Sequence, residues 1–162
     1  MTSEPAARPT TPPSAPRLAG IHHLKFAVAD LARSQRFYEI ALNAARIARF
    51  DHLRPDDGRL FGIVMDVPGL GTFLELRLNP LQAAAQAGFD PITFAVDGRR
   101  DLEAWAAHLD GLMIAHSPIL AGLVGWTLVL EDPDGRRIKY YTIETHGPEI
   151  PLTYDERWLG SM

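Results

Sequence analysis

Two segments of the chain, one in each half, alternate between apolar and polar positions. Residues 23–28 read His-Leu-Lys-Phe-Ala-Val and residues 91–96 read Pro-Ile-Thr-Phe-Ala-Val, so that Phe-Ala-Val recurs. Alternation with a period of two is typical of a half-buried β-strand. Because the same pattern opens both halves, the sequence predicts an internal repeat.

Each of these strands leads into an amphipathic helix. Asp30 is a good N-cap for a helix over residues 31–42, and Leu102, Trp105 and Leu109 recur at helical spacing in the second half. Shorter runs broken by turn residues follow each helix and predict further strands. These runs are 44–50, 60–67 and 72–78 in the first half, and 113–120, 126–130 and 137–143 in the second.

Each half therefore follows the order β-α-β-β-β. We expect an α+β fold in which two tandem βαβββ modules, at residues 20–80 and 88–145, form a cupped, partly open mixed-sheet barrel around a central pocket, with the helices outside. Residues 1–17 are rich in proline and predict a disordered tail. Residues 146–162 are a C-terminal extension that folds over the sheet, contacts a second subunit or closes the pocket.

Composition narrows the range of functions. The formal net charge of −4 argues against a nucleic-acid-binding protein, and the absence of cysteine excludes disulfides and thiol nucleophiles. No apolar run reaches the length of a membrane span. We therefore expect a cytoplasmic protein that associates with neither nucleic acid nor membranes.

Three motifs suggest a family. Residues 23–42 (HLKFAVADLARSQRFYEIAL), 73–76 (FLEL) and 132–139 (DPDGRRIK) together resemble the vicinal oxygen chelate superfamily, which includes glyoxalase I, bleomycin-resistance proteins and extradiol dioxygenases. The resemblance covers roughly residues 20–145. It implies paired βαβββ modules around a shared pocket, and most often a homodimer, but it does not fix a reaction.

The resemblance also implies where a metal would bind. Family members that use a metal draw its ligands from four places, which correspond here to His23, Glu75, Pro91 and Lys139. His23 and Glu75 match the pattern, whereas proline has no side-chain donor atom and a lysine ammonium has no lone pair. We therefore expect no tightly bound cofactor. A divalent metal held by His23 and Glu75, with His116 or a water as a further ligand, is the alternative.

Strand alternation indicates which side chains share the pocket. His23 is the candidate general acid or base, Glu75 orients it or acts as the base, and Lys139 takes the place of the metal, bonded to Glu75 or to a ligand oxygen. Tyr141 is a candidate hydrogen-bond donor, and His22 is expected to face away. The expected ligand-binding residues are Lys25, Phe73, Arg77, Thr93, Trp126 and Arg137.

Several functions fit these residues. The protein either binds and sequesters a hydrophobic or aromatic organic ligand, or acts as a metal-independent isomerase, cyclase or lyase, so whether it is an enzyme stays open. One alternative is a metal-dependent glyoxalase-type lyase or extradiol-type dioxygenase. Another is a non-catalytic structural subunit whose cavity is filled by its own side chains. Lys139 and Glu75 can also form a buried ion pair without any chemistry.

Overall fold

The computed structural model of the chain describes residues 15–160, so most of the predicted tail at 1–17 lies outside the described residues. The first module contains β1 (His23–Val28), α1 (Leu31–Leu42), β2 (Ala45–Arg46), a 3-10 helix η1 (Ala48–Phe50), β3 (His52–Leu53), β4 (Leu60–Asp66) and β5 (Phe73–Leu78). After the short helix α2 (Pro80–Ala85), the second module contains β6 (Ile92–Val96), α3 (Arg99–Gly111), β7 (Leu120–Ala121), β8 (Trp126–Glu131) and β9 (Arg137–Thr142). A last helix, α4 (Glu156–Leu159), lies in the C-terminal extension.

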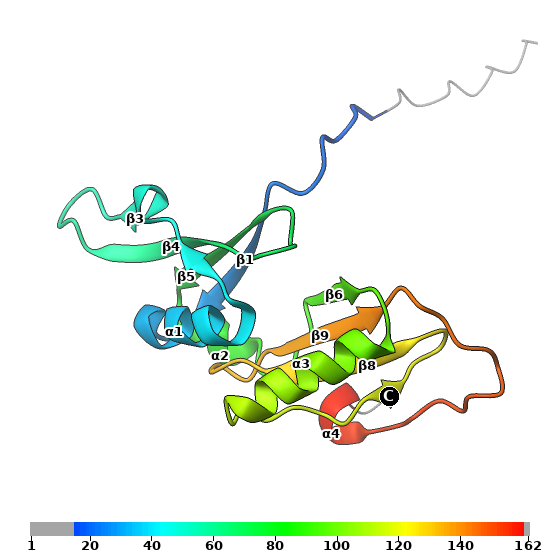
Figure 1. Ribbon diagram of the computed structural model, residues 1–162. Helices are drawn as coiled ribbons and strands as arrows, with labels where there is room; N and C mark the ends of the chain where they lie inside the picture. The colour runs from blue at the N-terminus through cyan, green and yellow to red at the C-terminus, as the bar shows by residue number, and fades with distance from the viewer. Residues whose placement is uncertain (1–14, 161–162) are drawn as a thin grey trace, which may run out of the picture.

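The two modules have the same topology (Figure 1). The first sheet has the order β1-β5-β4-β2, with β3 paired to β4, and the second has the order β6-β9-β8-β7. In each sheet the first and last strands of the module are parallel neighbours and the other pairs are antiparallel. The α+β fold and the repeated βαβββ order are confirmed, and the two mixed sheets do not close into a barrel.

The helices form where local signals place them. The Asp30 side chain accepts the Arg33 amide at 2.9 Å and caps α1, which ends at Asn43 in the left-handed conformation. The Asp101 carboxylate accepts the Gly98 amide at 2.8 Å at the start of α3. Polar groups that would otherwise lack partners at both helix starts are thereby satisfied.

Two strand predictions are wrong in their extent. Residues 113–120 form no continuous strand: a single bridge joins His116 to Leu130, and β7 begins only at Leu120. Pro118 interrupts the run because it has no amide to donate to a ladder. Residues 44–50 form only the two-residue strand β2 followed by the 3-10 helix η1.

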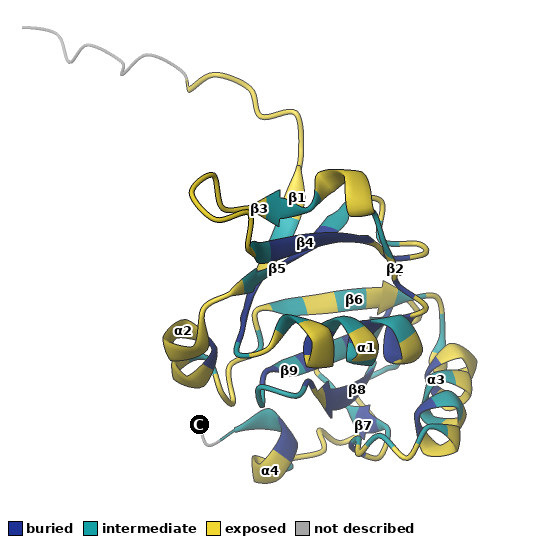
Figure 2. Cartoon of the chain, turned by 90° about the vertical axis from the view of Figure 1, so that its left-hand side faces the viewer, coloured by how far each residue is buried: buried dark blue, intermediate teal, exposed yellow. Residues whose placement is uncertain are grey.

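The two modules pack through their helix-bearing faces. One core cluster includes Phe26 and Leu76 from the first sheet, Leu42 from α1, and Leu128 and Tyr140 from the second sheet. Figure 2 shows buried positions concentrated on the strands of both sheets and on the sides of α1 and α3 that face them. The opposite faces of the two sheets therefore point away from each other.

A polar lock joins the modules inside this core. Asp132 and Arg136 form an ion pair at 2.6 Å, with side chains that are 0% and 1% exposed. The Tyr38 hydroxyl of α1 donates to Asp132 at 2.8 Å, and Arg136 donates to the Ala27 carbonyl of β1 at 2.5 Å. Burial raises the pKa of Tyr38 well above that of a free phenol, and the nearby Asp132 charge raises it further. The hydroxyl therefore remains protonated and can donate.

The C-terminal extension covers the outer face of the second sheet. Trp158 of α4 is 5% exposed and packs with Leu120 and Val129, and Arg137 donates to the Arg157 carbonyl at 2.6 Å. Within one chain, α4 therefore folds over the sheet, which is the first of the three possibilities for the extension. None of the helices among residues 15–160 is long and apolar enough to cross a membrane.

The polar lock predicts a stability effect that a surface pair does not have. Replacing Asp132 by Asn leaves the buried Arg136 guanidinium without a counter-charge, and we expect the free energy of unfolding to fall by about 3–5 kcal/mol in urea titrations. Arg33→Ala is the matched control, because Arg33 pairs with Asp134 but its side chain is 51% exposed. We expect this control to cost less than about 1 kcal/mol, and equal effects of both substitutions would contradict the lock.

Candidate functional site

The outer face of the first sheet gathers five polar side chains around one buried carboxylate. β1 and β5 are parallel neighbours in which Lys25 lies opposite Glu75 and Ala27 opposite Arg77. Leu24, Phe26 and Val28 point into the core, so His23 and Lys25 point outward beside Glu75. The predicted sharing of one face by β1 and β5 is therefore confirmed in this module.

Glu75 is the centre of the site. Its side chain is only 4% exposed, and Arg77 donates to Oε1 from Nε at 2.8 Å and from Nη2 at 2.5 Å. On the other oxygen, Oε2, His23 Nε2 lies at 3.2 Å and Lys25 Nζ at 3.6 Å. Two fixed cations thus surround one carboxylate, and the surroundings of Glu75 carry a positive balance even with neutral histidines.

His52 completes the Oε1 side of the site. Its Nδ1 lies 3.5 Å from Glu75 Oε1 and 3.0 Å from Arg77 Nη2. The β3–β4 register puts His52 opposite Gly62, and a Cβ at Gly62 would lie 3.0 Å from His52 Nδ1 and 3.3 Å from Arg77 Nε. Glycine at this position therefore leaves the space in which the imidazole and the guanidinium meet.

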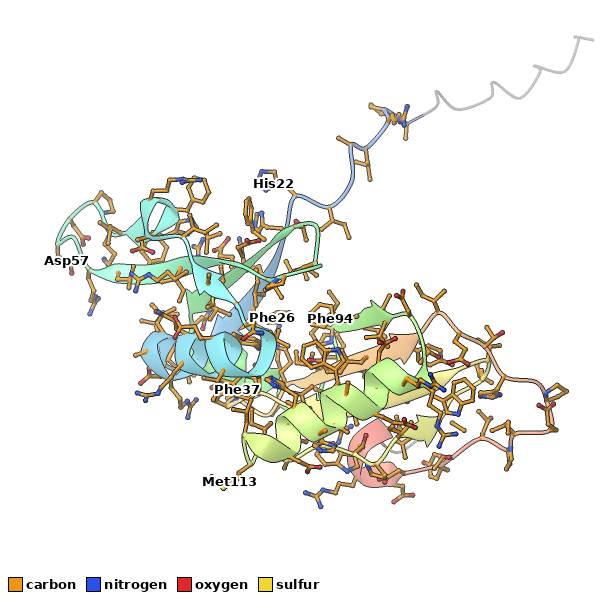
Figure 3. The ribbon with its side chains drawn as sticks, viewed as in Figure 1. His22, Phe26, Phe37, Asp57, Phe94 and Met113 are labelled. Carbon is orange, nitrogen blue, oxygen red and sulfur yellow. The ribbon has the colours of Figure 1, made fainter. Side chains whose placement is uncertain are left out.

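His22 extends the site beyond the start of β1. Its Nδ1 shares a hydrogen bond with His23 Nδ1 at 2.9 Å, so His22, His23 and Glu75 form a continuous chain of contacts. Figure 3 shows His22 at the outer end of β1, whereas Phe26 lies at its inner end near the second module. The expectation that His22 faces away is wrong, because residue 22 precedes the strand and strand alternation does not govern it.

A cavity of about 540 Å³ opens beside these residues. Phe50 and Phe73 form an aromatic wall with an edge-to-face contact at 6.0 Å between ring centroids. Asp51 also lines the cavity, but Arg46 already neutralises it at 2.5 Å. The lining residues are His22, His23, Phe50, Asp51, His52, Val64, Phe73 and Glu75. All of them belong to the first module.

Comparison with known proteins identifies the family. The sequence model of the Glyoxalase/Bleomycin resistance protein/Dioxygenase superfamily matches residues 20–140. The chain belongs to this superfamily. No curated protein matches it.

Solved structures of the superfamily share the fold. A glyoxylase/bleomycin resistance protein/dioxygenase domain from Frankia sp. EAN1pec is 21% identical with a TM-score of 0.62, covering 82% of this chain and 96% of that one. The antibiotic-binding protein TnmS3 from Streptomyces sp. CB03234 is 19% identical with a TM-score of 0.58, covering 78% and 98%. A mutant fosfomycin resistance protein FosX from Listeria monocytogenes, complexed with Mn(II) and a dihydroxypropylphosphonic acid, is 16% identical with a TM-score of 0.59, covering 77% and 90%.

The other half of the expected pocket lies on the second sheet, on the far side of the shared core. Ile138 and Tyr140 point into that core, so Lys139 between them points outward and away from the first sheet. Lys139 forms an ion pair with Asp90, and the expected contact with Glu75 is not among the ion pairs of residues 15–160. The reason is the packing of the modules, which turns the two site faces in opposite directions.

The remaining predicted residues of the second module also lie away from Glu75. Thr93 is opposite Lys139 in the sheet, and the Tyr141 hydroxyl accepts the Val124 and Gly125 amides at 3.3 and 3.2 Å. Trp126 contacts Arg99 and His146, and Arg137 contacts the C-terminal extension. His116 contacts Asp110 and the Ser117 carbonyl. The predicted residues of the first module therefore lie together, and those of the second module do not join them. The first group is His23, Lys25, Phe73, Glu75 and Arg77.

The contact between Glu75 and Arg77 predicts a measurable coupling. In a double-mutant cycle with Glu75→Gln and Arg77→Gln, we expect a coupling energy of about 1–2 kcal/mol in urea unfolding, because a charge-assisted contact to a buried oxygen is lost. A parallel cycle with Lys25→Gln is the control, since Lys25 is 50% exposed and 3.6 Å away, and its coupling should be below about 1 kcal/mol. Equal coupling in both cycles would show that Arg77 does not hold Glu75.

Proposed function

We propose that this protein binds a small organic anion with an aromatic or apolar body in the cavity beside Glu75, and does so without a tightly bound metal. The observation that carries the proposal is that cationic side chains of the protein itself already contact both oxygens of the Glu75 carboxylate. Arg77 donates twice to Oε1, and Lys25 and His23 lie beside Oε2. Because Lys25 and Arg77 neutralise Glu75, the imidazoles of His22, His23 and His52 that line the cavity are the natural partners for the oxygens of an anionic ligand.

The residues at this site fit a metal ion poorly. Arg77 Nη2 lies against both Glu75 Oε1 and His52 Nδ1, which are the two atoms that would have to coordinate a cation on that side. Lys25 lies within 3.6 Å of the other oxygen, where its charge repels a divalent ion. Among residues 15–160, no group of three or more His, Cys, Asp or Glu side chains is arranged to hold a metal.

The body of the ligand follows from the aromatic wall. Phe50 and Phe73 line the same cavity as His22 and His52, so an aromatic ring can pack against the phenyl groups while its acidic group accepts from the imidazoles. Sequestration of a small molecule accords with the similarity to TnmS3, an antibiotic-binding protein. The opposed site faces and the family resemblance also support a homodimer, in which a second copy covers the open side of the cavity.

One observation favours a second candidate, metal-independent acid–base chemistry. His23 Nε2 lies 3.2 Å from Glu75 Oε2, and His23 Nδ1 shares a hydrogen bond with His22 Nδ1, so the two imidazoles link the cavity to the carboxylate. Such a chain can pass a proton between the cavity and Glu75. A catalyst of this kind changes its ligand, so the identity of the bound molecule after incubation, followed by NMR, separates it from a binder.

We expect the single substitution Arg77→Gln to change the preference of the site from an organic anion to a divalent metal ion. We expect the wild-type protein to bind 2-naphthoate more tightly than the neutral 2-naphthamide, and to show no rise in melting temperature with Mn²⁺, Ni²⁺ or Zn²⁺. Arg77→Gln removes a cation and releases Glu75 Oε1 and His52 Nδ1, so naphthoate affinity should fall about tenfold or more while a metal-dependent rise appears. Calorimetry and thermal unfolding measure the two effects.

Arg33→Gln is the matched control, because it removes one arginine charge from the opposite side of the first sheet. It should leave both affinities unchanged. Equal binding of naphthoate and naphthamide, or tight metal binding by the wild type that is lost in His23→Ala, would overturn the proposal.

A further inference from the structure

A second cavity lies between the two modules, separate from the cavity beside Glu75. Its volume is about 320 Å³, and its walls include Leu42, Val67 and Leu70 from the first module and Phe94, Trp105 and Tyr140 from the second. These residues share no member with the lining of the Glu75 cavity. Figure 3 shows Phe94 at the junction between the modules.

The walls are aromatic and carry no charged side chain. Tyr140 stacks on Trp105 with ring centroids 4.7 Å apart and planes at 21°, and Phe94 lies against Tyr140 at 6.1 Å. Trp105 and Phe94 are half-buried, so the aromatic surface reaches solvent through the cavity. Such a surface favours a flat, uncharged ring system, because a charged group would lose its hydration without gaining a partner.

Tyr140 supplies a polar group without a partner. The residue is 2% exposed, and its hydroxyl is buried with no hydrogen bond among the described residues. Tyr38, which is equally buried, satisfies its hydroxyl with Asp132. Burial raises the pKa of Tyr140 well above its usual value, so the hydroxyl stays protonated and can donate. An unpaired buried donor is unusual in a folded protein and needs an explanation.

The backbone of β6 adds further polar groups. Residues Ile92–Val96 line the cavity, and within residues 15–160 β6 pairs with β9 alone, so one edge of this strand has no ladder partner. The cavity therefore combines an apolar aromatic wall with a few hydrogen-bonding groups at its margin. This combination is typical of small-molecule sites.

We infer that this inter-module cavity is a second ligand site, which takes a flat, uncharged aromatic molecule bearing a carbonyl oxygen that accepts a hydrogen bond from Tyr140. The ligand class differs from that of the Glu75 cavity in charge: the first site attracts an acid, and this one takes an aryl ketone or a related neutral compound. The inference does not depend on the function proposed for the Glu75 site.

The test uses 2-acetylnaphthalene as the neutral ketone and 2-ethylnaphthalene as its analogue without the oxygen. We expect calorimetry to show saturable binding of the ketone to the full chain and about tenfold weaker binding to Tyr140→Phe, which loses only the donor. Binding of 2-ethylnaphthalene should be the same in both proteins. Without ligand, Tyr140→Phe should unfold at the same or a higher temperature, because it removes an unpaired buried hydroxyl.

Two further measurements locate the ketone. Leu70→Trp places a larger side chain at the cavity and should abolish ketone binding, whereas Arg77→Gln in the Glu75 site should leave it unchanged. Undiminished ketone affinity in Tyr140→Phe, or displacement of the ketone by 2-naphthoate with loss on Arg77→Gln, would overturn the inference. So would the absence of saturable ketone binding to the wild-type protein.

Discussion

The buried ion pair between Asp132 and Arg136 determines which way the two modules face. Asp132 accepts the Tyr38 hydroxyl from α1, and Arg136 reaches the Ala27 carbonyl on β1, so the pair joins the β8–β9 turn to the first module. Because a buried charge must keep its partner, the modules cannot turn relative to each other without a large cost in free energy. The helix-bearing faces therefore stay together, and each sheet presents its other face outward.

This orientation explains why the candidate site lies in one module. On the first sheet, the outward face gathers Glu75, its cations and an aromatic wall. On the second sheet, Trp158 and Leu159 of α4 occupy the corresponding face. A small local feature, the missing side chain of Gly62, then allows His52 and Arg77 to meet over Glu75. The proposed preference for an anion follows from these contacts.

Much of this structure could be predicted from the sequence because it depends on local patterns. Alternation placed His23 and Glu75 on one face with Arg77, and the Asp30 cap marked the start of α1. The contribution of His52 could not be predicted, because it depends on the register of a two-residue strand against β4. The separation of Lys139 from Glu75 could not be predicted from strand alternation either, since it depends on how the two modules pack. The signal for that packing was present in the DPDG turn, where Asp132 is a partner of Arg136 as well as a turn residue.

We propose that the cations beside Glu75 leave no room for a tightly bound metal and favour an anionic ligand. Elemental analysis of protein purified without an affinity tag and dialysed against metal-free buffer tests this claim most directly. We expect manganese, iron, nickel and zinc far below one equivalent per chain. Near-stoichiometric metal that disappears in His23→Ala would contradict it, because the metal would then have displaced Arg77 and Lys25 from the carboxylate.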